Sequence, residues 1–220
     1  MKWGILGALD AEVDLIRNKM TITSETPLFG TVFYEGTVGR EQIVLVCCGV
    51  GKVNAAVCAA AVMNQFEADC IINIGIAGAM AHGLKILDVV ISDEVGFHDQ
   101  DEVMLKYYPK RAFFPADSSL ISLCERACQA LPEMEHRWRR GRIVSGDVFV
   151  NDAAVKQSIN ERYAPACVEM EGAATSRTRK RRWRARWRSS APCRTLPTMP
   201  PILRMTTLLT RLRTPPLPLS

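Results

Sequence analysis

Short, almost uninterrupted apolar runs recur through the first 174 residues, and each gives way to glycine or to a segment with helical spacing. They include residues 2–8, 41–49, 68–80 and 86–99. Strands that are apolar on both faces are typical of a sheet covered by helices on both sides. The pattern therefore predicts an α/β fold. A further strand is expected at 31–39, with a turn at Gly39-Arg40. Residues 68–80 are expected to form a strand that runs into a Gly-containing loop, 141–152 a strand and then a loop, and 165–174 a strand that turns into the start of a helix. Helices are expected at 10–20, 49–66, 116–131 and 152–163.

The charge pattern divides the chain into two unlike parts. Residues 175–220 hold 12 of the 28 Lys and Arg, none of the 23 Asp and Glu, and none of the 14 Gly. Residues 1–174 are therefore acidic, and the overall net charge of +5 describes neither part. We predict an α/β domain over 1–174 and an Arg/Pro-rich, irregular tail over 175–220. A tail that binds nucleic acid or a membrane is the alternative, but it lacks an amphipathic or Gly-rich RNA-binding pattern.

Cysteine usage and the N-terminus favour a cytoplasmic protein. Most of the eight Cys lie in apolar runs and form no CxxC pair, which argues against a disulfide framework and a zinc site. The first apolar run is short and is followed by Asp10 and Glu12, unlike a signal peptide. No run approaches the roughly 20 apolar residues of a membrane span. We expect no membrane association.

Acidic and small residues follow the predicted strands at five places. They are Glu12, residues 49–51, residues 77–78, residues 147–149 and residues 169–171. Ligands of open α/β sheets bind beyond the carboxyl ends of the strands. The sequence therefore predicts a pocket built from five strand ends.

Taken singly, most of these features have ordinary explanations. Glu12 could simply complement a helix dipole, and "GVGK" lacks the spacing of a phosphate-binding loop. His98 is expected to be solvated, and residues 137–142 to form a surface loop. The stretch "VEMEG" (168–172) is more informative, because two carboxylates at the end of a buried strand need partners. One could face the two hydroxyls of a sugar and the other backbone donors; a helix N-cap is the alternative.

Six motifs together resemble the 5′-methylthioadenosine/S-adenosylhomocysteine nucleosidases of the purine nucleoside phosphorylase-like superfamily. They are "GILGALDAEV", "CCGVGKVNAA", "INIGIAGAM", "ISDEVGFHDQD", "IVSGDVFV" and "VEMEGAA". The resemblance implies a three-layer αβα fold around a central mixed sheet, a homodimer, no metal and no cofactor. It also implies hydrolysis of the N-glycosidic bond of an adenosine thioether in methionine salvage.

The resemblance also implies a role for individual residues. Glu12 would be the general base that activates water, and Glu171 would bind the ribose hydroxyls with Met170 packed on the sugar. The remaining residues would contact the base and the sugar: Phe149 by stacking on adenine, Val150 through its backbone, and Gly78 on the ribose or water side. Carboxylates suit this reaction because the sugar becomes cationic as the bond breaks.

The family's general acid, an Asp in a Ser-Asp-x-Ala-Asp loop, has no counterpart here. The chain contains no Asp after Asp152. We hypothesise a shift of reading frame near residues 173–175. Read one base out of frame, residues 196–202 can encode Ser-Asp-Asn-Ala-Ala-Asp, and Met199-Pro200 forces the first Ala. Without a carboxylic acid to protonate adenine, the chain as written is predicted to be inactive or nearly so.

Two other functions remain open. A purine nucleoside phosphorylase or another nucleoside hydrolase could use the same fold, although "IGIAGAM" offers no cation for phosphate and Glu12 would repel it. A nucleic-acid-binding protein acting through the Arg-rich tail is the alternative of another class, and salt-dependent binding would reveal it.

Overall fold

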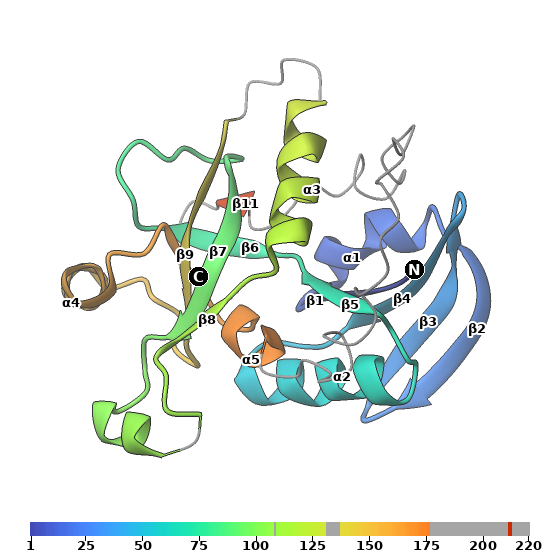
Figure 1. Ribbon diagram of the computed structural model, residues 1–220, viewed down its shortest axis with the longest axis horizontal. Helices are drawn as coiled ribbons and strands as arrows, with labels where there is room; N and C mark the ends of the chain where they lie inside the picture. The colour runs from blue at the N-terminus through green and yellow to red at the C-terminus, as the bar shows by residue number, and fades with distance from the viewer. Residues whose placement is uncertain (108, 131–136, 177–210, 213–220) are drawn as a thin grey trace, which may run out of the picture.

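The computed structural model describes residues 1–107, 109–130, 137–176 and 211–212, and Figure 1 shows strands and helices packed together in an α/β fold. This confirms the predicted fold class. The described strands lie in two sheets, where the resemblance implied one central mixed sheet.

The first sheet has five strands in the order β2-β3-β4-β1-β5. Strand β1 (Lys2–Gly7) lies between β4 (Glu41–Cys47) and β5 (Cys70–Asn73) and runs parallel to both. The predicted hairpin is confirmed by antiparallel pairing of β3 (Thr31–Val38) with β4. The edge strand β2 (Thr21–Leu28) was not predicted, because its residues are mostly polar and exposed.

Both faces of this sheet are covered, as the continuous apolar runs predict. On β4, Ile43 and Leu45 belong to a buried cluster that includes residues of α1 (Asp10–Arg17) and α3 (Ser118–Gln129). Val44 and Val46 belong to a second cluster with residues of α2 (Lys52–Asn64). A Cβ atom on Gly4 would lie 2.3 Å from Val62 Cγ1, so this glycine permits the close approach of α2 to β1.

The second sheet has six strands in the order β11-β6-β10-β9-β7-β8. Their bounds are β6 (Ile76–Ala79), β7 (Val89–Phe97), β8 (Phe113–Pro115), β9 (Trp138–Ser145), β10 (Cys167–Glu169) and β11 (Arg211–Leu212). Two predictions are corrected here. Residues 68–80, expected as one strand running into a loop, form two strands, β5 and β6, in different sheets. The expected surface loop at 137–142 is wrong, since residues 138–142 belong to β9.

The remaining helices are η1 (Glu102–Lys106), α4 (Ala153–Tyr163) and α5 (Gly172–Ser176). Asp117 caps α3, since its side chain accepts from the N–H groups of Ser119 and Leu120. Short α5 lies beside α2 in Figure 1. No helix in the described ranges is long and apolar enough to cross a membrane.

The tail predicted for residues 175–220 falls largely outside the described residues. Thr175 and Ser176 complete α5, and Thr175 is buried. Both residues of β11 pair with β6, and Arg211 also pairs with β7.

Candidate active site

Glu12 is held by backbone donors from two separate segments. Its Oε2 atom accepts from the N–H groups of Ala8 at 2.7 Å and Leu9 at 3.0 Å, just after β1. Its Oε1 atom accepts from the N–H of Ile76 at 2.9 Å, at the start of β6. A carboxylate offers about four acceptor positions. Three are therefore used for orientation, and one on Oε1 remains for a further donor.

Two glycines leave room for this carboxylate. A Cβ atom on Gly75 would lie 3.1 Å from Glu12 Oε1, and one on Gly7 would lie 3.2 Å from Glu12 Cβ. Gly75 lies just after β5. The last hydrogen bond between this segment and β1 runs from Ile74 N–H to the Leu6 carbonyl at 2.8 Å, so the chain leaves β1 at Gly75. The break between β5 and β6, which the sequence did not reveal, therefore brings the Ile76 donor to Glu12.

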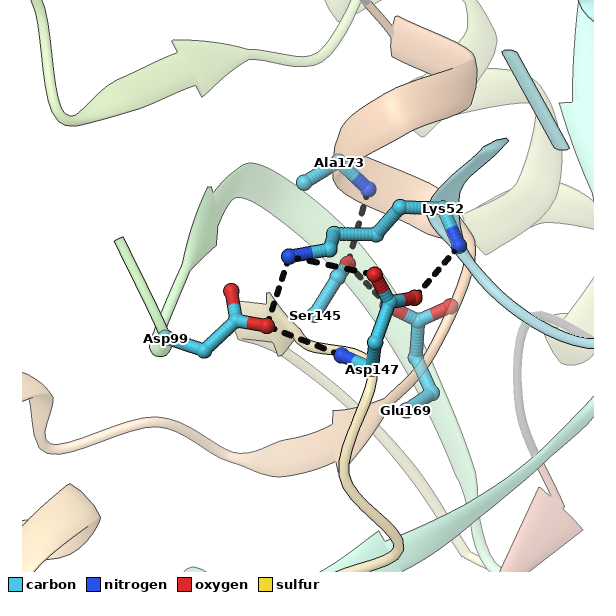
Figure 2. A network of polar contacts seen from close by, with 6 residues as sticks. All are labelled: Lys52, Asp99, Ser145, Asp147, Glu169 and Ala173. Carbon is cyan, nitrogen blue, oxygen red and sulfur yellow. Dashed lines mark hydrogen bonds and ion pairs between the residues drawn. The ribbon is translucent and has the colours of Figure 1, made fainter.

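Glu169 faces backbone donors at the start of α5. Its Oε2 atom accepts from the N–H groups of Glu171 at 2.9 Å and Gly172 at 2.6 Å. The Ser145 hydroxyl donates to Glu169 Oε1 and accepts from Ala173 N–H, as Figure 2 shows. Burial raises the pKa of Glu169, and these donors oppose that rise. Glu169 is therefore the carboxylate of "VEMEG" that faces backbone donors.

The side chain of Glu171 reaches the beginning of α2. Its Oε1 atom accepts from the Gly51 N–H at 2.7 Å, and the residue is only 8% exposed. Burial raises the pKa of Glu171 to about 7, the charges of Glu169 and Glu12 add to the rise, and the Gly51 bond opposes it. Glu12, Glu169 and Glu171 thus form one group of mutually repelling carboxyls.

The segment after β9 lies next to this group. Gly146 N–H donates to the Glu169 carbonyl at 3.2 Å. Phe149 is 62% exposed, whereas Val150 packs on a small apolar cluster beneath α4. Met170, between the two carboxylates, is partly buried. Hydrogen bonds therefore connect three of the five predicted strand ends, at or next to residues 49–51, 147–149 and 169–171, and the charge of Glu12 acts on Glu171.

Gly78 lies within β6 opposite Val168 of β10, and the glycine that adjoins Glu12 is Gly75. His98 is half-buried rather than solvated, because its ring packs on Gly146, where a Cβ atom would lie 2.3 Å from Nε2. Burial lowers the pKa of His98, Asp99 opposes this, and the charge of Lys52 adds to it.

This arrangement can stabilise positive charge and accept hydrogen bonds. Carboxylates directed at one site stabilise a sugar that becomes cationic in the transition state. They also accept bonds from hydroxyl groups or water. Within the described ranges, no group of three His, Cys, Asp or Glu residues is placed to hold a metal ion.

Comparison with known proteins identifies the family. Residues 2–177 match the family model of the phosphorylase superfamily. A 5′-methylthioadenosine/S-adenosylhomocysteine nucleosidase from an Exiguobacterium species is 39% identical over an alignment of 184 residues that covers 81% of this chain and 78% of the relative. The chain belongs to this nucleosidase family. The resemblance seen in the six sequence motifs is confirmed.

Solved nucleosidase structures share the fold. The enzyme from Neisseria meningitidis, in complex with methylthio-immucillin-A, has a TM-score of 0.76 and 36% identity, covering 80% of this chain and 78% of that one. The enzyme from Colwellia psychrerythraea, in complex with adenine, has a TM-score of 0.76 and 32% identity, covering 81% and 76%. The nucleosidase fold is therefore the fold of the described residues.

Proposed function

We propose that the site binds 5′-methylthioadenosine and S-adenosylhomocysteine, and that the family reaction performed there is hydrolysis of the N-glycosidic bond to release adenine. The observation that carries the proposal is the meeting of Glu12 and Glu171 at the strand ends. They are close enough for the Glu12 charge to raise the pKa of Glu171. The names of the nucleosidase relatives and the ligands of the two solved structures support the substrate class.

Glu12 is the proposed base for the attacking water. Its three backbone bonds fix the carboxylate, and the unused acceptor position on Oε1 can take a proton from a bound water. Because the carboxylate is positioned before substrate binds, little reorganisation is needed in the transition state.

Glu171 is the proposed ligand of the ribose hydroxyls. The Gly51 bond occupies one acceptor position and leaves others for two hydroxyl donors. Met170 is proposed to pack on the sugar, Phe149 to stack on adenine and Val150 to bond the base through its backbone. The large exposed surface of Phe149 is consistent with a ring that awaits a partner. Gly78 stays a prediction for the ribose or water side.

Protonation of adenine requires an acid that residues 175–220 do not supply. This stretch contains no Asp or Glu, and the superfamily match ends at residue 177. We therefore keep the reading-frame hypothesis as the explanation, with 1–174 as the nucleosidase-like domain. The chain as written is proposed to bind nucleoside but to release adenine slowly or not at all.

Hydrolysis is favoured over phosphorolysis by the charge of the site. Glu12, Glu169 and Glu171 would repel a phosphate ion placed among them. A water molecule carries no such penalty. Binding of nucleic acid through the Arg-rich segment stays an alternative only for residues outside the described part of the chain.

A homodimer is proposed through the face of α2. Val50, Val53 and Val57 recur at helical spacing and are 47%, 72% and 38% exposed. An exposed apolar stripe of this kind is typical of an interface. It begins beside Gly51, so a second copy packed there would lie next to the proposed ribose site.

A reducing, cytoplasmic compartment and a role in methionine salvage complete the proposal. Seven cysteines in the described ranges are free thiols. Persistent thiols in this number are typical of proteins from reducing compartments.

The substrate proposal is tested by titration calorimetry on the 220-residue chain with adenine and with 5′-methylthioadenosine. Glu171→Ala should weaken nucleoside binding at least tenfold and adenine binding much less, because only the nucleoside has ribose hydroxyls. Glu25→Ala, on exposed β2, is the matched control and should bind both ligands normally. Equal losses for both ligands would remove the ribose role from Glu171.

A further inference from the structure

The segment that carries Phe149 and Val150 has no regular secondary structure of its own. Between the end of β9 at Ser145 and the start of α4 at Ala153, neither helix nor strand is formed. We call residues 146–151 the purine loop, because the proposed adenine contacts belong to it. A base can stack reproducibly on such a loop only if other parts of the fold fix its position.

Asp147 connects the purine loop to two other elements. Its N–H donates to Asp99 Oδ2 at 2.9 Å, just beyond β7. Its Oδ1 atom accepts from the N–H of Lys52, the first residue of α2, at 2.8 Å. Gly51 lies so close that a Cβ atom there would be 3.1 Å from Asp147 Oδ1. The loop is therefore joined at one residue to both β7 and α2.

The Lys52 side chain closes this connection into a ring of contacts. Its Nζ lies 2.6 Å from Asp99 Oδ2 and 3.4 Å from Asp147 Oδ2, and Figure 2 shows it between the two carboxylates. It also lies 5.5 Å from the centroid of the Phe97 ring. The Lys52 and Asp99 side chains are only 25% and 20% exposed, so solvent screens this pair less than a surface ion pair.

The pKa of Asp99 is lowered, as expected for a carboxylate paired with Lys52. Burial acts to raise its pKa, but the Lys52 hydrogen bond, the Asp147 N–H and the Lys52 charge outweigh burial and lower it. His98 also contributes a lowering charge from the same strand end. Asp99 therefore keeps its charge, and its bond to Lys52, throughout the neutral pH range.

The beginning of α2 binds both Glu171, the proposed ribose ligand, and the purine loop through two consecutive backbone N–H groups. Gly51 N–H bonds Glu171 at 2.7 Å, and Lys52 N–H bonds Asp147 at 2.8 Å. The spacing between the proposed ribose and adenine contacts is thus set by one rigid helix end. We propose that Lys52, Asp99 and Asp147 are positioning residues that hold the purine loop at the right distance from Glu171.

This inference rests on the proposed function, and its test separates the two. Lys52→Met, Lys52→Arg and the control Lys156→Met, on an exposed position of α4, are made in the 220-residue chain. Adenine affinity is measured by calorimetry, and hydrogen exchange is measured on peptides that cover residues 146–152. Lys52→Met should weaken adenine binding about tenfold and speed exchange in that segment. Lys52→Arg should restore most of both, and Lys156→Met should match the parent.

Unchanged adenine affinity and unchanged exchange in Lys52→Met would overturn the positioning role. If Lys52→Met does not fold, Asp99→Asn decides, because it keeps the shape of the side chain and removes the charge that Lys52 contacts. Faster exchange at 146–152 in Asp99→Asn supports the role, and parent-like exchange overturns it. Failure of the parent chain to bind adenine would instead overturn the proposed function, and the exchange comparison would still test the network.

Discussion

Replacing Glu171 by glutamine should stabilise the protein, relative to its parent, more at pH 8 than at pH 5. In the unfolded chain this carboxyl ionises near its ordinary pKa of 4.5, whereas burial raises the pKa of the folded state to about 7. Between these values the folded state binds more protons than the unfolded state. The contribution of Glu171 to stability therefore falls as pH rises from about 4.5 to about 7.

The size of the effect follows from the same pKa values. The rise from 4.5 to about 7 corresponds to at most about 3 kcal/mol, and partial access of solvent reduces this to about 2 kcal/mol. Glutamine keeps an oxygen that can accept from Gly51 N–H and carries no charge to be repelled by Glu169 and Glu12. The variant should therefore gain about 2 kcal/mol on the parent between pH 5 and pH 8.

Urea unfolding of the 220-residue chain at the two pH values measures this difference. Other titrating groups are common to parent and variant, so most of their contribution cancels in the comparison. Glu25→Gln, an exposed substitution on β2, is the matched control and should show no pH-dependent gain. A stability difference for Glu171→Gln that is the same at pH 5 and pH 8 would refute the argument that burial and neighbouring carboxyls disfavour its charge.

Three further predictions concern water activation and assembly. In the protein with the reading frame restored after Ala174, Glu12→Gln should lower the rate of adenine release about 10²–10⁴-fold and leave substrate affinity nearly unchanged. Steady-state kinetics measures the rate and calorimetry the affinity, and near-normal turnover would mean that another group is the base. In the same frame-restored protein, Gly75→Ala, whose Cβ atom would lie 3.1 Å from Glu12 Oε1, should lower turnover at least tenfold while adenine still binds. Val53→Glu should convert the dimer proposed for the 220-residue chain into a monomer in sedimentation experiments, and an unchanged mass would exclude this face.

The apolar runs predicted β1 and β4 well because these two inner strands of the first sheet are buried on both faces. Ile43 and Leu45 pack on one side and Val44 and Val46 on the other, which requires a continuous apolar run. The edge strand β2 lacks that signal. It is held by main-chain pairing to β3, and main-chain bonds leave little trace in side-chain sequence.

The candidate site was predictable as a set of strand ends but not as a set of contacts. The segments before and after Gly75 are similarly apolar, so the sequence of residues 68–80 gave no sign that they contribute strands to two different sheets. The bond from Ile76 N–H to Glu12 could not be anticipated for that reason. Likewise, lysine and aspartate are common on protein surfaces, so the sequence gives no sign that the fold places Lys52 and Asp99 in contact with Asp147.

Adenine release from 5′-methylthioadenosine, measured side by side for the 220-residue chain and for the chain with its frame restored after Ala174, tests the central claim most directly. The account predicts that both proteins bind the nucleoside and that only the restored protein releases adenine at an enzymatic rate, because it regains a carboxylic acid to protonate the base. No release by the restored protein would contradict the nucleosidase function of this site. Comparable release by the two proteins would contradict the reading-frame explanation and return residues 175–220 to the functional part of the chain.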